Sequence, residues 1–340
     1  MLKAILAFIL LLASVAVPAA AQVGKHGRLE QFRDFPSRYV DPRNISVWLP
    51  ADYDPNGKPY AVIYMQDGQN LFDPGKSYGG TPWGVDEVLT QLIGAGHVRR
   101  TIVVGIWNTP KRLREYMPAR VFERLPGDYR TRVAALYSGP PVSDAYLSFM
   151  VRELKPFIDR RYRTSHKPRD TLAMGSSMGG LISLYAMTQY PQVFGGAACL
   201  SSHWPLFLPS GDAPMPGADI DAIAGAFEGY LRARLPRRGT HRLWFDHGDH
   251  TLDRFYAPFQ QRVDRVVEGR GWVRGRDFES RFFPGAAHDE RSWHNRLDQP
   301  LLFMLGRSRD DRAGSTRARR QPKANRGSFA PDAKDMGRGE

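Results

Sequence analysis

A glycine-flanked pair of serines has the residue types and the spacing for covalent chemistry. The motif Gly175-Ser-Ser-Met-Gly179 follows an apolar run at residues 171–174, and an apolar helical pattern continues over residues 181–190. Between a strand and a helix, Gly-x-Ser-x-Gly presents its central serine as a nucleophile. Only Ser177 stands at that centre, because centring the motif on Ser176 would put methionine at both flanks, where strand and helix pass closely. The sequence therefore predicts Ser177 as a nucleophile.

A serine hydroxyl reacts when a base removes its proton and a third group orients that base. The predicted base is His288, which lies between the last expected strand, residues 280–283, and the last expected helix, residues 292–305. The loop at residues 246–253 offers three carboxylates that could orient this histidine. Serine, acid and histidine then occur in the chain order of an α/β hydrolase.

Backbone N–H groups that could stabilise an oxyanion are expected at two turns. Residues 66–72 follow the apolar run 60–65 and contain a glycine turn that can aim the N–H of Gln69 into a cleft. The N–H of Met178 directly follows the nucleophile, and the two donors would form an oxyanion hole. Local sequence alone fits an ordinary Asp-Gly turn at residues 66–72 equally well.

Strand-like and helix-like segments alternate along the chain after Arg43. This order predicts an α/β fold with a mostly parallel central sheet and helices on both faces, a three-layer sandwich. Residues 44–49 are expected to form an edge strand. The other expected strands span residues 60–65, 101–106, 171–174, 196–200, 241–245 and 280–283, and the expected helices span residues 143–158, 181–190 and 292–305.

Ligands of such sheets bind beyond the carboxyl ends of the strands, so aromatic residues there predict a substrate pocket. The candidates in or near segments that follow predicted strands are Trp83, Trp107, His203 and Trp204. Taken alone, each of them is more typical of the core or of a supporting position than of a ligand contact. If several face the cleft, they favour an aromatic acyl group, either a phenolic ester or a catecholate whose negative charge would suit Arg112 and Arg114.

The two ends of the chain differ in composition from the middle. Lys3, the apolar run at residues 4–17 and small residues at 19–21 are typical of a signal peptide cut before Gln22, so we expect an exported protein, periplasmic or secreted. Residues 307–340 contain ten Lys or Arg, five Asp or Glu and one aromatic residue, a composition that predicts a disordered basic tail. Residues 22–306 would then form one catalytic domain.

Charge and cysteine content narrow the function classes further. The formal net charge is +13, but zinc-finger spacing, a recognition helix and aromatic-basic alternation are absent, so no nucleic-acid partner is expected. No integral membrane segment is expected in the mature chain. The single cysteine, Cys199, rules out an internal disulfide. Neither a metal nor an organic cofactor is expected, because the clustered histidines and aspartates lack a recognised ligand spacing. That cluster comprises His241, Asp246, His247, Asp249 and His250.

Six segments, taken in order, carry a family resemblance. They are Tyr64-Met-Gln-Asp-Gly-Gln-Asn-Leu-Phe72, Val104-Gly-Ile-Trp-Asn108, Arg114-Glu-Tyr-Met-Pro118, Glu153-Leu-Lys-Pro156, Gly175-Ser-Ser-Met-Gly-Gly180 and Gly285-Ala-Ala-His288. The chain resembles the putative-esterase branch of the α/β hydrolases, which includes esterase D-like, feruloyl-esterase-like and ferric-siderophore-esterase-like enzymes. The resemblance covers roughly residues 44–305 and is specific for the family, not for a substrate.

The resemblance implies an α/β-hydrolase fold and a serine carboxylic ester hydrolase acting on a small-molecule or polysaccharide-linked ester. The residues matching the family's functional positions are Ser177 as nucleophile, His288 as base, and Gln69 and Met178 as oxyanion donors. The family places its acid a few residues after a strand-ending glycine, which favours Asp253 over Asp249; here Gly248 is followed directly by Asp249, where the family often has threonine. An acyltransferase using the same serine and a non-catalytic binding protein are the alternatives, and the oligomeric state stays open.

Overall fold

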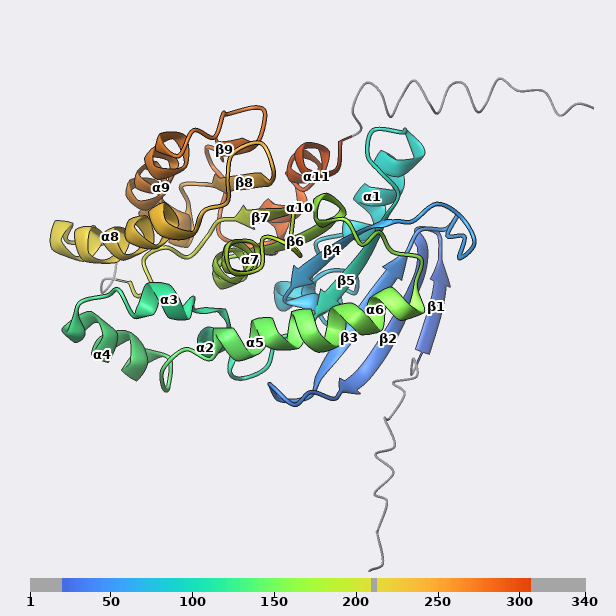
Figure 1. Ribbon diagram of the computed structural model, residues 1–340, viewed down its shortest axis with the longest axis horizontal. Coiled ribbons are helices and arrows are strands. Elements are labelled where there is room, and N and C mark those ends of the chain that lie inside the picture. Colours follow the sequence, from blue (N-terminus) through green and yellow to red (C-terminus); the bar gives the residue numbers. More distant parts are fainter. Residues whose placement is uncertain (1–19, 209–212, 307–340) are drawn as a thin grey trace, which may run out of the picture. The chain divides into compact units, whose positions relative to one another are not determined.

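One sheet organises the fold in this computed structural model, which describes residues 20–208 and 213–306. Across these residues the strand order is β1-β2-β3-β5-β4-β6-β7-β8-β9 (Figure 1). The strands are β1 (Ala20–Gly24), β2 (Gly27–Phe35), β3 (Arg43–Leu49), β4 (Ala61–Gln66), β5 (Thr101–Ile106), β6 (Thr171–Ser176), β7 (Gly196–Leu200), β8 (Arg242–His247) and β9 (Phe278–Phe282).

The helices that connect and cover these strands are of two kinds. The α-helices are α1 (Val85–Gly94), α2 (Arg112–Tyr116), α3 (Ala119–Phe122), α4 (Gly127–Leu136), α5 (Ser143–Phe149), α6 (Lys155–Arg161), α7 (Met178–Gln189), α8 (Gly217–Arg234), α9 (Ala257–Gly269), α10 (Glu290–His294) and α11 (Asp298–Leu305). The short 3-10 or π segments are η1 (Gly68–Asn70), η2 (Tyr78–Gly80), η3 (Met150–Leu154), η4 (Pro168–Asp170) and η5 (Thr251–Phe255).

The six strands β4 to β9 run parallel to one another and contain the predicted apolar runs. Strands β4, β5, β6 and β7 are buried along their whole length, as expected where helices cover both faces. After β5 the chain crosses to the opposite side of β4 to form β6. Connections leaving β4 and β6 therefore diverge and open a crevice at their carboxyl ends.

The other end of the sheet is antiparallel. Strands β1, β2, β3 and β5 pair antiparallel in that order, so β3 lies inside the sheet. The prediction of an edge strand at residues 44–49 is therefore wrong. Strands β1 and β2 cover that edge. They were not predicted because β2 contains neither a continuous apolar run nor a regular alternation of apolar and polar residues.

Helices pack on both faces of the sheet and give three layers (Figure 1). Along β4, Val62 and Tyr64 belong to an apolar core shared with α5, α7, α8 and α9. Ile63 and Met65 belong to a second core, shared with α1 and α11. Because neighbouring residues of a strand point to opposite faces, each core lies on its own side of the sheet. The predicted α/β-hydrolase fold is confirmed.

Two expected helices are interrupted. Residues 143–158 form α5, the π segment η3 and α6 in succession. Residues 292–305 fall in two helices, α10 and α11, rather than one. Pro300 explains that break, because it has no N–H for the carbonyl of Arg296 and its ring would collide with that carbonyl in a continuous helix.

The predicted tail, residues 307–340, lies outside the described residues, and so does the predicted signal peptide up to residue 19. Strand β1 begins at Ala20, two residues before the cut expected at Gln22. Of the helices in the described part of the chain, none is both long enough and apolar enough to cross a bilayer.

Candidate active site

The turn between β6 and α7 holds Ser177 in an unusual backbone conformation. Its φ is 57° and its ψ is −127°, a region that residues other than glycine rarely adopt. A Cβ atom on Gly175 would lie 2.8 Å from the backbone of Gly179 and 3.0 Å from the Cβ of Gln66. Strand and helix can approach this closely only because the flanking residue has no side chain. The segment thus has the strand, sharp turn and helix that its motif predicts.

Three backbone hydrogen bonds fix Ser177 at the carboxyl edge of the sheet. Its N–H donates to the carbonyl of Leu200, the last residue of β7, at 3.0 Å. Its carbonyl accepts from the N–H groups of Gly180 at 3.1 Å and His203 at 3.2 Å. Ser177 and His288 line the same cavity at this edge. The structure therefore brings the predicted nucleophile and the predicted base to one space.

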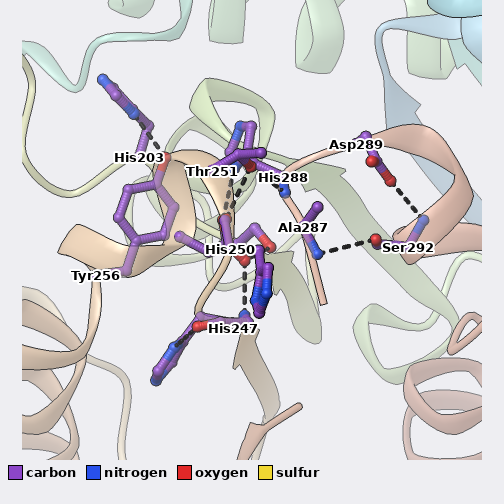
Figure 2. Close-up of polar contacts among 12 residues, drawn as sticks. His203, His247, His250, Thr251, Tyr256, Ala287, His288, Asp289 and Ser292 are labelled. Carbon is purple, nitrogen blue, oxygen red and sulfur yellow. Dashed lines mark hydrogen bonds and ion pairs between the residues drawn. The ribbon is translucent and has the colours of Figure 1, made fainter. Parts of the chain in front are cut away.

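The ring of His288 is held by Asp253. Its Nδ1 lies 2.7 Å from Oδ1 of Asp253, whose side chain is fully buried. The N–H of His288 donates to Thr251 Oγ1 at 2.8 Å (Figure 2). The rings of Tyr256 and Trp293 pack edge-on against the imidazole, with centroid distances of 5.5 Å and 5.0 Å. Because Nδ1 is hydrogen-bonded to the carboxylate, Nε2 is the ring nitrogen that remains available to accept a proton.

The second oxygen of Asp253 is also saturated. Its Oδ2 accepts hydrogen bonds from Ser201 Oγ and from the N–H of Gly248, both at 2.6 Å. Burial raises the pKa of Asp253, but the hydrogen bonds from His288, Ser201 and Gly248 outweigh burial and lower it overall. Asp253 is therefore an anion at neutral pH.

A buried ion pair anchors Ser201. Arg296 donates from one terminal nitrogen to Ser201 Oγ at 2.8 Å and to Asp246 Oδ1 at 2.9 Å. Trp293 Nε1 donates to Ser201 Oγ at 3.1 Å. Since Ser201 Oγ accepts both of these bonds, its own proton is directed to Asp253. The network connects the sheet edge to the carboxylate that holds His288.

Asp249, the alternative acid, lies elsewhere in the same loop. Its Oδ1 accepts from the N–H of Gly285 at 2.8 Å and lies 2.7 Å from Nδ1 of His250. Gly285 has a φ of 79°, so Asp249 supports the turn that precedes His288. Of the two carboxylates, Asp253 is the one that contacts the histidine.

The other histidines of this region point to separate partners. His247 Nδ1 lies 2.7 Å from the carbonyl of the next residue, and His250 contacts its neighbouring aspartate (Figure 2). His241 Nε2 contacts a different main-chain carbonyl at 2.8 Å. Within the described ranges, no group of three His, Cys, Asp or Glu side chains is arranged to hold a metal ion.

The two predicted oxyanion donors stand at the beginnings of helical segments. Met178 is the first residue of α7, and Gln69 is the second residue of η1, directly after β4. The first N–H groups of a helix have no intrahelical acceptor, so they can donate to an anionic oxygen. Gln69 also lines the cavity that holds Ser177.

The cavity has a volume of about 310 Å³, and most of its lining residues carry polar side chains. Arg112 binds Asp67 through two hydrogen bonds, Nε to Oδ1 at 2.7 Å and a terminal nitrogen to Oδ2 at 2.8 Å. Asn108 Nδ2 donates to the same Oδ1 at 2.6 Å, and Asn70 Nδ2 donates to Glu290 Oε1 at 3.1 Å. The lining residues are Asp67, Gln69, Asn70, Tyr78, Asn108, Arg112, Ser176, Ser177, His288, Glu290 and Trp293.

Two tryptophans predicted for the substrate pocket are core residues instead. Trp204 is buried in the core beneath α8, and its Nε1 donates to Gln260 at 2.9 Å. Trp83 is buried in the opposite core and packs against Trp293, with ring centroids 5.6 Å apart. Neither borders the cavity, because each indole is enclosed by apolar neighbours.

The other two predicted pocket residues also lie off the cavity wall. Trp107 Nε1 donates to Ser46 Oγ at 2.9 Å, which turns its ring toward β3. His203 Nδ1 lies 2.7 Å from the hydroxyl of Tyr256 (Figure 2). Burial lowers the pKa of His203 to about 3, so this imidazole is neutral at neutral pH. The aromatic wall of the cavity is supplied by Tyr78 and Trp293.

Sequence reasoning missed most of the polar wall. Asp67 and Asn108 follow the ends of β4 and β5, so the strand-end rule contained a signal for both. Arg112 was predicted to be available for an anion, whereas its guanidinium is bound to Asp67. Glu290 and Ser201 carry no local sequence signal for their positions.

Comparison with known families decides the relationship. The family model described as "Putative esterase" matches residues 37–304. The chain belongs to this family. Two Bacillus subtilis proteins of uncharacterised function resemble this esterase-family chain: YbbA is 26% identical over 166 residues, and YjcH is 26% identical over 171 residues. These matches cover 48% and 50% of the chain, and 58% and 60% of the relatives, so the chain spans about three fifths of their length.

Solved structures share the fold of this esterase-family chain. An IroE-like serine hydrolase from Shewanella oneidensis has a TM-score of 0.59 at 20% identity, covering 81% of this chain and 79% of that one. The enterobactin esterase FES from Shigella flexneri has a TM-score of 0.55 at 18% identity, covering 84% and 60%. A ferulic acid esterase has a TM-score of 0.53 at 19% identity, covering 82% and 97%.

Proposed function

We propose that the protein hydrolyses carboxylic esters, with Ser177 as nucleophile, His288 as base and Asp253 as the orienting acid. The observation that carries the proposal is the 2.7 Å contact between His288 Nδ1 and the buried Asp253 beside a cavity that Ser177 also lines. A neutral histidine held by a carboxylate through Nδ1 has Nε2 available to accept a proton. Membership of the esterase family supports the same reaction.

In the proposed reaction, His288 Nε2 takes the proton of Ser177 while Oγ attacks the ester carbonyl. The imidazolium that results is stabilised by the anionic Asp253 and then gives its proton to the leaving alkoxide. Water attacks the acyl-enzyme by the same route and releases the acid. Asp253 stays ionised throughout, consistent with the hydrogen bonds that lower its pKa.

The negative charge on the tetrahedral intermediate is assigned to the N–H groups of Gln69 and Met178. Both stand in the first turn of a helical segment. Met178 directly follows the nucleophile, and Gln69 lines the cavity that holds it, so both positions are set by the fold before the substrate arrives. Donors that need no reorganisation during the reaction contribute the most to such catalysis.

Ser177→Ala tests the assignment directly. We expect kcat/KM for p-nitrophenyl acetate to fall by at least about 10⁴-fold with the fold unchanged by circular dichroism. Ser176→Ala is the matched control, since the adjacent serine ends β6, and it should lower the rate by less than about tenfold. Wild-type turnover in Ser177→Ala would refute the assignment.

The acyl part of the substrate is proposed to be aromatic and uncharged. Tyr78 and Trp293 provide aromatic surface in the cavity. A catecholate is less well matched, because Arg112 is bound to Asp67 and Arg114 lies outside this cavity, donating to the carbonyl of Pro140 at 2.8 Å. A kinetic panel of phenolic and short aliphatic acyl esters with one alcohol tests this, and equal kcat/KM values would contradict it.

Export is the last part of the proposed function, and it is based on the composition of residues 1–21 alone. N-terminal sequencing of the protein recovered outside the cytoplasm should give Gln22 as the first residue. Recovery of the uncut chain in the cytoplasm would contradict export.

A further inference from the structure

Glu290 places a carboxyl group in the wall of the cavity, two residues after His288. The residue is only 8% exposed, and it begins α10. A buried carboxylate normally has a cation or several donors as partners, because burial without them is costly. The partners of Glu290 therefore indicate what else the cavity is built to hold.

Asn70 is the protein partner of one Glu290 oxygen. Tyr78 N–H donates to Asn70 Oδ1 at 3.1 Å, which fixes the orientation of the amide. The Asn70 Nδ2 group must then face Glu290, and it donates to Oε1 at 3.1 Å. A carboxylate accepts about four hydrogen bonds, so Glu290 keeps acceptor capacity on the side of the cavity.

The cation nearest in the wall is already engaged. Arg112 uses Nε and a terminal nitrogen to bind both oxygens of Asp67. In the ranges the structure describes, no lysine or arginine forms an ion pair with Glu290. The wall thus carries two carboxylates and one guanidinium, an excess of negative charge that disfavours anionic ligands and favours hydrogen-bond donors.

The position of Glu290 in the chain indicates which part of an ester it would meet. The leaving alcohol takes its proton from His288 Nε2, so it must lie against His288. Glu290 belongs to the same segment and lines the same cavity. The oxyanion, by contrast, is assigned to the N–H groups of Gln69 and Met178.

We infer that Glu290 is a specificity-determining residue that accepts a hydrogen bond from a hydroxyl group on the alcohol part of the substrate. This inference rests on the proposed function. The chemical class selected is the ester of a neutral polyhydroxylated alcohol, such as glycerol or a sugar. A hydroxyl suits the site because it donates to the carboxylate while the remaining polar wall, with Asn70 and Asn108, can bind its oxygen.

The test compares esters that share an acetyl group and differ only in the alcohol: propyl acetate, glycerol monoacetate and acetylcholine. With wild-type protein, kcat/KM for glycerol monoacetate should exceed that for propyl acetate by about 10- to 100-fold, the range for a hydrogen bond to a charged group. In Glu290→Gln the ratio should fall to within a few-fold of one, because a hydroxyl forms a weaker hydrogen bond with a neutral amide than with a carboxylate. Asn70 would engage the new carbonyl, so that an N–H₂ donor rather than an acceptor faces the cavity.

Asp289→Asn is the matched control. It removes the same charge one residue away, where the exposed Asp289 accepts from Ser292 N–H at 2.7 Å (Figure 2), and both rates should stay unchanged. A ratio near one in the wild-type protein, or a ratio unaffected by Glu290→Gln, would overturn the inference. A preference for acetylcholine over glycerol monoacetate would assign the carboxylate to a cation instead, and would also overturn it.

Binding to Ser177→Ala separates this inference from the proposed function. Calorimetric Kd values for the same esters should favour glycerol monoacetate about 10- to 100-fold in Ser177→Ala, and this preference should fall to about a few-fold in the double variant with Glu290→Gln. If no ester is hydrolysed while this binding preference persists, the proposed reaction fails and the role of Glu290 stands. If esters are hydrolysed but the binding preference for glycerol monoacetate is absent, the proposed reaction stands and the role of Glu290 fails.

Discussion

His288 and Asp253 meet through a 2.7 Å hydrogen bond although 35 positions separate them in the chain. Asp253 lies in η5 after β8, and His288 lies in the loop after β9, the neighbouring parallel strand. The two loops leave the same edge of the sheet, so a carboxylate on one can hold an imidazole on the other. The sheet therefore sets this contact before any substrate binds.

The variant Asp253→Asn should show whether Asp253 or its neighbour Asp249 is the acid that supports catalysis. We expect kcat to fall by about 10³- to 10⁴-fold, because an amide cannot stabilise the imidazolium and can hold the ring in the wrong tautomer. Asp249→Asn changes the same functional group at an exposed position, and should cost less than about tenfold. Steady-state kinetics of both variants on one ester provide the measurement, and the opposite ranking would reassign the acid.

Low pH should decrease the free energy of unfolding, partly through protonation of Asp253. The pKa of Asp253 in the folded protein lies below that of an ordinary aspartate, so its stabilising contribution is fully present above about pH 4 and is lost as the pH falls through the folded pKa. The difference in unfolding free energy between the wild type and Asp253→Asn should accordingly shrink between about pH 4 and pH 2. Urea denaturation across this range measures it, and a difference independent of pH would be inconsistent with a lowered pKa.

Arg296→Met should destabilise the protein strongly. Arg296 and Asp246 are 3% and 0% exposed, so removing the guanidinium leaves a buried carboxylate without its cation, at a cost of about 3–5 kcal/mol. Arg232→Met is the control, because Arg232 pairs with Glu228 at 3.2 Å on the surface and should contribute less than about 1 kcal/mol. Equal losses in urea denaturation would show that the buried pair has no special role.

The same variant should affect the site as well as stability. Without Arg296, Ser201 loses one of the two donors that direct its proton to Asp253. The fraction of the Arg296→Met protein that remains folded, assayed well below its Tm, should therefore show a reduced kcat and a KM close to that of the wild type. Wild-type kcat in that material would mean that Trp293 alone positions Ser201.

The strands that could be predicted from sequence are those buried on both faces. Residues 101–106 and 196–200 are continuous apolar runs, and they correspond to β5 and β7. Strand β2 gave no such run, because residues such as Glu30 interrupt it. Glu30 pairs with Arg28 at 3.2 Å and Arg161 at 3.5 Å, and it accepts a hydrogen bond at 2.8 Å from Tyr162, 132 positions away. Local sequence does not contain a contact of that separation.

The same reasoning explains what was found and missed in the site. Ser177 has a local motif, and His288 follows a recognisable strand, so each could be located before the structure. Ser201 joins Asp253 to Arg296 over separations of 52 and 95 positions, and no spacing rule indicates such contacts. Trp204 was assigned to the pocket because it follows a strand end, although an indole alone at such a position is more typical of the core.

The central claim is that His288 makes the hydroxyl of Ser177 reactive, and fluorophosphonate labelling with peptide mapping tests it most directly. We predict one adduct, on Ser177, formed at least about 10³-fold more slowly in His288→Ala than in the wild-type protein. An unmodified Ser177 in fully folded protein, an adduct on another serine, or a labelling rate indifferent to His288 would contradict the account.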